Sequence, residues 1–162
     1  MTDNTENIIR FTLVFNSFKK RLYNYVLKMT EDVMLAEDIV QDIFLKLYQN
    51  LDNIRSKDNI NYWLFTTTRN EVYTYFRRKR IRTDQFNVED IDEIEKREVK
   101  EIVIKELKNL PVEQKEVFIL REYSGLKYSE IGNVLNIDER LVKSRLNKAR
   151  DKLINKVSKL IV

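Results

Sequence analysis

Apolar residues recur at three- and four-residue steps along most of the chain, which is the spacing of one face of an α-helix. A wide stripe of this kind lies between residues 9 and 29, and a second runs from Val33 to Leu51. A third helix is predicted from Ile60 to Arg80, beginning with aromatic and ending with cationic side chains. Two glycines and one proline in 162 residues leave few interruptions. We therefore predict an all-α protein, with Pro111 as an early residue of a further helix.

Near the C-terminus the pattern indicates two helices joined by a tight turn. The shorter one, residues 128–135, places Ile131, Val134 and Leu135 on one side. The turn follows at residues 136–138, and Asp138 is the predicted N-cap of the next helix. This arrangement is typical of a helix-turn-helix that binds DNA.

The second of these helices has one apolar and one basic face. The apolar positions, which we expect to pack inward, are Leu141, Val142, Leu146, Ala149 and Leu153. The opposite face carries Arg140, Lys143, Ser144, Asn147, Lys148 and Arg150. Such side chains suit the major groove of DNA, where Arg and Lys bind guanine or phosphate and Asn pairs with adenine. A basic amphipathic helix is also common as a solvated surface, so the pattern alone leaves both readings open.

Charge is distributed in blocks that the net charge of +4 conceals. Six basic residues and one acidic residue lie between Arg69 and Arg82, whereas residues 84–101 contain eight acidic and three basic ones. The acidic block has few apolar anchors, which is typical of a linker. We therefore predict two small helical domains, residues 1–82 and 105–162, joined by an acidic linker at 83–104.

The composition excludes several kinds of chemistry. The chain has no Cys and no His, which removes disulfides, thiolate nucleophiles, the usual zinc ligands and His-based triads. No apolar run approaches the roughly 20 residues that span a bilayer. We expect a cytoplasmic protein without membrane insertion, catalytic residues, metal, cofactor or small-molecule substrate.

Two sets of motifs resemble one known family. Ala36 to Leu47, followed by Trp63 to Asn70 and the cationic run 77–80, resembles region 2 of bacterial RNA polymerase sigma factors of the extracytoplasmic-function (ECF) type. Leu110-Pro111, the run 117–126 and the runs 142–146 and 149–153 resemble region 4 of the same family. The resemblance covers about residues 10–82 and 105–160, which is most of the chain.

The resemblance implies a transcription initiation factor that binds core RNA polymerase and directs it to promoters, and that is regulated by an anti-sigma factor. The residues implied in polymerase binding are Asp38, Gln41, Asp42 and Leu45, with Phe44 and Tyr48 as further apolar anchors. Those implied in capturing melted, single-stranded minus-10 DNA are Asn59, Asn61, Thr66, Asn70, Tyr73 and Arg77. Trp63 is interpreted as core instead, because large aromatic side chains usually dominate packing.

Duplex DNA at the minus-35 element would be bound by the helix-turn-helix. The implied residues are Arg121, Tyr128, Lys143, Ser144, Arg145, Asn147 and Lys148. Two positions depart from the common family pattern. Arg140-Leu141 stands where Gly-Thr is usual, and Gly132 stands where Ala is usual. Loss of the Thr removes a possible hydroxyl contact to phosphate, whereas Gly132 would permit a close helix approach.

Two other functions remain open from the sequence. A stand-alone helix-turn-helix regulator would bind duplex DNA tightly and specifically without polymerase. A helical nuclease would use carboxylates such as Asp38 and Asp42 to hold Mg²⁺, but two carboxylates four residues apart on one exposed helix are too few for such a site.

Overall fold

The computed structural model describes residues 2–54, 56–82 and 99–161, and in these ranges the chain forms helices and turns without a strand. The N-terminal helices are α1 (Thr2–Thr30), α2 (Val33–Asn50), the short 3₁₀ turn η1 (Leu51–Asn53) and α3 (Lys57–Arg82). The C-terminal ones are α4 (Val99–Lys108), α5 (Val112–Phe118), the π-helical turn η2 (Ile119–Tyr123), α6 (Tyr128–Leu135) and α7 (Glu139–Ile161). The predicted all-α fold class is confirmed.

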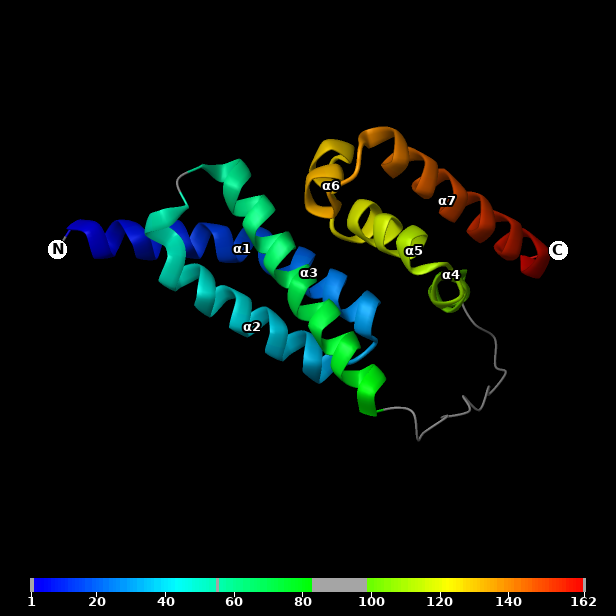
Figure 1. Cartoon of the computed structure of the whole chain (residues 1–162), viewed down its shortest axis with the longest axis horizontal. Coiled ribbons are helices and arrows are strands. Elements are labelled where there is room, and N and C mark those ends of the chain that lie inside the picture. The colour runs from blue at the N-terminus through cyan, green and yellow to red at the C-terminus, as the bar shows by residue number, and fades with distance from the viewer. Residues whose placement is uncertain (1, 55, 83–98, 162) are drawn as a thin grey trace.

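Helices α1, α2 and α3 pack on one another as a bundle (Figure 1). Their inward faces follow the predicted stripes, and the fully buried side chains include Leu22, Ile43, Leu47 and Leu64. Asp32 caps α2 by accepting a hydrogen bond from the Leu35 N–H at 3.0 Å. This bond satisfies one of the free amides at the helix start, so the sharp turn between α1 and α2 is fixed locally.

Helix α3 begins earlier than the sequence predicts. It starts at Lys57 instead of the predicted Ile60, and its first turn is supported by the Ser56 hydroxyl, which accepts from the Asn59 N–H at 3.2 Å. The turn before it is held by Arg10 of α1, whose guanidinium donates to the carbonyl of Leu51 at 3.0 Å and to that of Ile54. The start of α3 is thereby fixed to α1.

The C-terminal helices enclose a second buried cluster that includes Val117, Leu120, Ile131 and Leu146. Pro111 is the N-cap of α5 and adopts extended backbone angles, so the prediction that it is an early helical residue was wrong by one position. Helix α4 starts at Val99 and packs against α7. The acidic stretch predicted as a linker, up to residue 98, lies outside the described residues.

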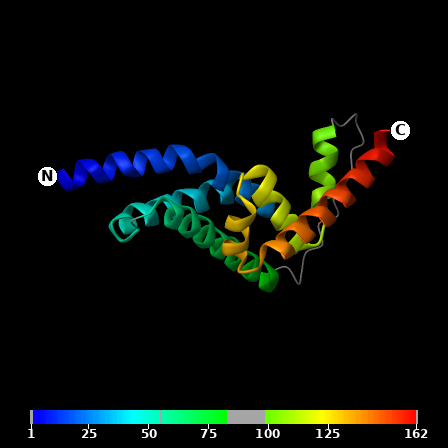
Figure 2. The ribbon, with the colours of Figure 1, turned by 90° about the horizontal axis from the view of Figure 1, so that it is seen from above.

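The two helical groups contact each other directly. Helix α1 lies against η2, and α3 lies against α6, as the two perpendicular views show (Figures 1 and 2). Helix α3, which carries the predicted minus-10 residues, therefore lies beside α6, the first helix of the helix-turn-helix.

Candidate nucleic-acid interface

The turn between α6 and α7 is defined by three residues. Asn136 ends α6 in the left-handed conformation, with φ 55° and ψ 49°. Asp138 accepts a hydrogen bond from the Leu141 N–H at 2.8 Å, which confirms it as the cap of α7. A Cβ on Gly132 would lie 2.8 Å from the carbonyl oxygen of Ile137, closer than such contacts allow. Glycine at 132 therefore permits the close approach of α6 to the turn that follows it.

Helix α7 presents the predicted basic face to solvent. Val142, Leu146, Ala149 and Leu153 are buried as expected, but Leu141 is 38% exposed, so its predicted inward packing was wrong. It lies on the same side of α7 as the exposed Lys148, about 100° around the helix from the buried Val142. On the opposite face Lys143, Asn147 and Lys148 are exposed, while Ser144 and Arg145 are partly buried.

Arg121 and Tyr128 are positioned by each other at the edge of this face. The Arg121 guanidinium lies 4.6 Å from the centre of the Tyr128 ring and donates a hydrogen bond to the Leu126 carbonyl at 3.0 Å. The Lys143 ammonium lies 5.7 Å from the same ring. Arg150, which was predicted on the basic face, instead pairs with Glu122 of η2. Two cations therefore flank one tyrosine, an arrangement suited to a phosphate.

Helix α2 presents the four predicted polymerase-binding residues on its outer face. Asp38, Gln41, Asp42 and Leu45 are all exposed, with 59% of Leu45 accessible. Tyr48 is 46% exposed beside them, but Phe44 is 3% exposed and packs against Phe15. The prediction that Phe44 is a surface anchor was therefore wrong, because its side chain fills the space between α1 and α2.

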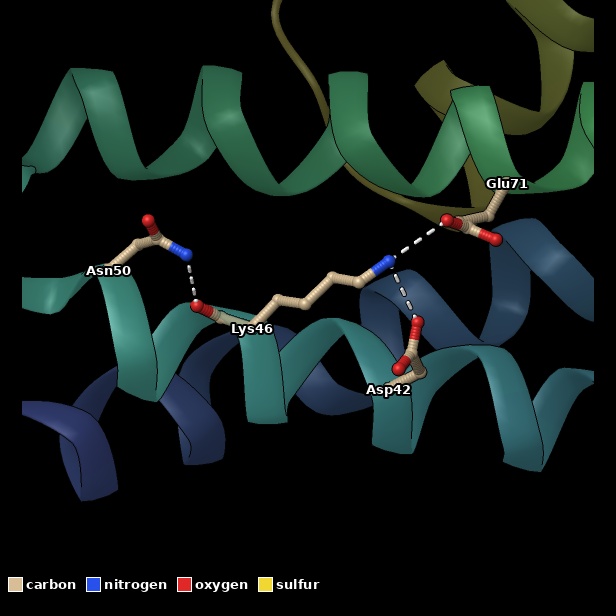
Figure 3. Close-up of polar contacts among 4 residues, drawn as sticks. All are labelled: Asp42, Lys46, Asn50 and Glu71. Carbon is tan, nitrogen blue, oxygen red and sulfur yellow. Dashed lines mark hydrogen bonds and ion pairs between the residues drawn. The ribbon is translucent and has the colours of Figure 1, made fainter.

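Lys46 joins this face of α2 to α3 (Figure 3). Its ammonium lies 3.0 Å from a carboxylate oxygen of Asp42 and 3.0 Å from one of Glu71. The hydrogen bonds to Asp42 and then to Glu71 raise the pKa of Lys46 above its ordinary value. Because Asp42 is already paired, a cation on a docking partner would have to compete with Lys46 for it.

The six predicted minus-10 residues fall into two groups. Asn59, Asn70 and Arg77 are exposed on α3, and Arg77 donates to the Thr74 hydroxyl at 3.1 Å. The other three face inward: Asn61 donates to Glu130 of α6, Tyr73 donates to Glu116 of α5, and the Thr66 hydroxyl is buried. Trp63 is partly buried against the core, as interpreted from the sequence.

Glu116 is the residue that sequence reasoning missed. It is 2% exposed, and its carboxylate accepts hydrogen bonds from the Tyr25 hydroxyl at 2.9 Å, Arg69 Nε at 2.6 Å and the Tyr73 hydroxyl at 2.6 Å. Burial, and after it the adjacent Glu116 carboxylate, raises the pKa of both tyrosines. A glutamate next to Val117 in a short amphipathic helix gives no signal of burial, because the covering residues lie in the other domain.

Two helical domains, one with a helix-turn-helix whose basic face is open, define a DNA-binding protein of the helix-turn-helix class. Residues 14–82 match Sigma-70 region 2 and residues 100–153 match Sigma-70, region 4. The chain belongs to the sigma-70 family and, within it, to the sigma factors of the ECF type.

Similar proteins span nearly the same length. RNA polymerase sigma factor SigZ of Bacillus subtilis strain 168 is 27% identical over 145 residues, covering 86% of this chain and 82% of its own. The ECF RNA polymerase sigma-E factor of Escherichia coli strain K12 is 29% identical over 142 residues, covering 76% and 74%. The sigma factor RpoE of Bartonella quintana, solved with the anti-sigma factor NepR, has a TM-score of 0.73 at 25% identity and covers 98% of both chains.

The chain is therefore a transcription initiation factor that directs RNA polymerase to promoters, and the stand-alone regulator is not favoured. Sigma factors are in general not enzymes. Within the residues that the structure describes, no group of three or more acidic side chains is placed to hold a metal ion. No helix in those ranges is long and apolar enough to cross a membrane.

Proposed function

We propose that residues 1–82 bind core polymerase and minus-10 DNA, that residues 83–104 link the domains, and that residues 105–162 bind minus-35 DNA. The observation that carries this division is the exposure of two unlike faces on separate domains. One is the polar face of α2 with Asp38, Gln41 and Asp42 around Leu45, and the other is the basic face of α7. The α2 face offers an apolar anchor ringed by polar groups, which is the usual anatomy of a protein interface.

Each DNA-binding face would contact a different form of DNA. The α7 face, with Lys143, Ser144, Asn147 and Lys148, has the side chains that read base edges in a major groove. Arg121, Tyr128 and Arg145 at its border would hold phosphates. Helix α3 would capture unpaired bases of the minus-10 element through Asn59, Asn61, Thr66, Asn70, Tyr73 and Arg77, since it combines polar and aromatic groups with cations.

Three further features complete the proposal. The protein acts in the cytoplasm, where bacterial core polymerase and promoters are found. It has no catalytic activity of its own and needs no cofactor. It is held inactive by an anti-sigma factor, which the complex of Bartonella quintana RpoE with NepR supports by analogy.

A pull-down with purified bacterial core polymerase tests the docking face. Gln41→Ala with Asp42→Ala should reduce binding, because the double variant removes two polar groups around Leu45 without touching the buried core. Asp151→Ala with Asn155→Ala is the matched control, since it likewise removes one carboxylate and one amide side chain, here from exposed positions of α7. Stoichiometric binding by wild type and control, lost in the α2 variant, is the expected result. Equal binding by all three would place the polymerase contact elsewhere.

A further inference from the structure

Glu116 lies at the centre of the contact between the two domains. It projects from α5 into a cage formed by Tyr25 of α1 and by Arg69 and Tyr73 of α3. All three partners belong to the N-terminal domain, so each of these three bonds crosses the domain boundary. A carboxylate that is 2% exposed must be paired, because an isolated buried charge is very costly.

The burial of Glu116 depends on the other domain. Its neighbour Glu113, three residues earlier on α5, is exposed. The bonds of Glu116 are made to residues 43 to 91 positions away, not to its own helix. Were the domains to part, the carboxylate would regain water and Arg69 would lose its ion pair. Glu116 therefore stabilises the contact between domains rather than the C-terminal domain itself.

A second set of contacts between the domains involves α1. Arg21 Nε donates to the Ser124 carbonyl at 2.7 Å, and the Ser124 hydroxyl donates back to the Arg21 carbonyl at 2.9 Å. Ser124 is fully buried. Together with the Asn61 to Glu130 bond between α3 and α6, these pairs make the contact extend along both α1 and α3. We call this arrangement the closed state.

In the closed state, contacts between the domains engage residues that DNA would need. Tyr73 is bonded to Glu116 of α5, and Asn61 is bonded to Glu130 of α6. These are two of the six residues proposed to capture unpaired minus-10 bases. DNA and the C-terminal domain therefore compete for one side of α3.

We infer that Glu116 holds the protein in an autoinhibited closed state, in which the C-terminal domain covers the base-capturing side of α3. The protein opens when Glu116 withdraws from Tyr25, Arg69 and Tyr73. This inference rests on the proposed minus-10 role of α3. In the closed state α3 binds an internal carboxylate, that of Glu116. In the open state it binds single-stranded DNA instead.

The closed state also contains groups that favour its opening. The Asn61 amide oxygen and the Thr66 hydroxyl are buried and have no hydrogen-bond partner among the described residues. An unpaired buried polar atom destabilises the arrangement that buries it, and Asn61, which is bonded to Glu130 of α6, would gain water or DNA partners once α6 moved away. The contact between domains is therefore strong at Glu116 and weaker at Asn61.

The test uses full-length protein with fluorophores for energy transfer on Ser17→Cys and Lys152→Cys, two exposed positions in different domains of a chain without other cysteines. Glu116→Gln keeps the size of the side chain but removes its charge, and Glu113→Gln on the exposed side of α5 is the matched control. Arg69→Gln removes the same ion pair from the other domain. Circular dichroism checks that each variant remains helical.

Energy transfer should fall for Glu116→Gln and for Arg69→Gln but not for Glu113→Gln. Binding of a randomised pool of single-stranded DNA, about 12 nucleotides long as suits such sites, should strengthen about tenfold in Glu116→Gln, since a charge-assisted hydrogen bond is lost from the closed state. The variant with both substitutions should open no further than Glu116→Gln alone, because each substitution removes the same Arg69–Glu116 ion pair.

Three outcomes overturn the inference. Unchanged energy transfer in Glu116→Gln would show that Glu116 does not hold the domains together. Reduced energy transfer without stronger DNA binding would show that the closed state does not block α3. A variant with Asn61→Cys and Glu130→Cys can also be cross-linked with a short bismaleimide. If it binds DNA as well after cross-linking as before, the closed state does not block α3.

A separate assay tests the proposed minus-10 role of α3 independently of the closed state. If polymerase carrying the wild-type protein fails to retain the DNA pool, the minus-10 assignment is wrong, whereas energy transfer still decides whether Glu116 closes the molecule.

Discussion

At the scale of single residues, Lys143 and Lys148 are exposed on α7 and available to DNA. Replacing each by Ala should weaken minus-35 binding by about 1 to 3 kcal/mol for every true base contact. The measurement is binding of the polymerase complex to a series of duplexes with single base changes at one salt concentration. Lys159→Ala, in the last turn of α7, is the control. An equal loss on every duplex would mean that the two lysines contact phosphate alone.

Gly132 sets the distance between α6 and the turn that follows it. Gly132→Ala should destabilise the C-terminal domain by about 1 to 3 kcal/mol, because the added methyl meets a backbone carbonyl that has little room to move. Thermal unfolding measures the loss. Gly125, with φ 70° and open space around it, provides a contrast: Gly125→Asn should be tolerated better than Gly125→Ala, since Asn adopts the left-handed conformation more readily. Unchanged stability of Gly132→Ala would mean that the turn relaxes.

At the scale of elements, α2 and α7 begin at aspartate caps of the same kind. Asp138→Ala should cost about 0.5 to 2 kcal/mol, because the Leu141 amide loses its acceptor at the start of the recognition helix. Asp32→Ala should cost a similar amount in the N-terminal domain. Chemical denaturation compares the two, and DNA binding should fall only for Asp138→Ala. A loss of duplex binding in Asp32→Ala would contradict this separation.

The helices were largely predictable because each buries one face of apolar side chains, and such a face appears in the sequence as apolar residues three or four positions apart. The buried faces of α1, α2 and α7 lie where the periodicity places them, and the caps at Asp32 and Asp138 follow from local chemistry. Errors arose at the ends of the stripes. Leu141 precedes the buried Val142 by one residue, about 100° around the helix, and so lies on the side of the exposed Lys148. Phe44 is turned into the bundle by its packing against Phe15.

At the scale of the whole molecule, the contact between domains should depend on pH. The pKa values of Tyr25 and Tyr73 are raised above the ordinary 10.0 in the closed state, chiefly by burial. Their contribution to stability is therefore complete below pH 10 and is lost as the pH rises above it, because the open state ionises first. Energy transfer between the domains should fall above pH 10. The fall should be shallower in Tyr25→Phe than in Tyr62→Phe, which changes an exposed tyrosine of α3. Identical pH profiles would show that Tyr25 does not contribute.

The arrangement of the two domains could not be predicted from the sequence. Glu116 and Ser124 are polar residues whose side-chain partners lie far away in the sequence, 43 to 91 positions earlier for Glu116 and 103 for Ser124. Periodicity reports which face of a helix is buried, but it does not report which distant helix covers that face. The same applies to Asn61 and Tyr73, which were identified from the family resemblance and which the structure places against the other domain.

The order of the two domains along the chain also has a consequence during synthesis. A ribosome completes α3 at Arg82 well before it adds Glu116, and the Ser124 contact to Arg21 spans 103 positions. At about 5 to 20 residues per second, the N-terminal domain emerges seconds ahead of the residue that closes it. Each newly made molecule therefore passes through an interval in which α3 is uncovered, and a chain truncated within that interval would keep it uncovered permanently.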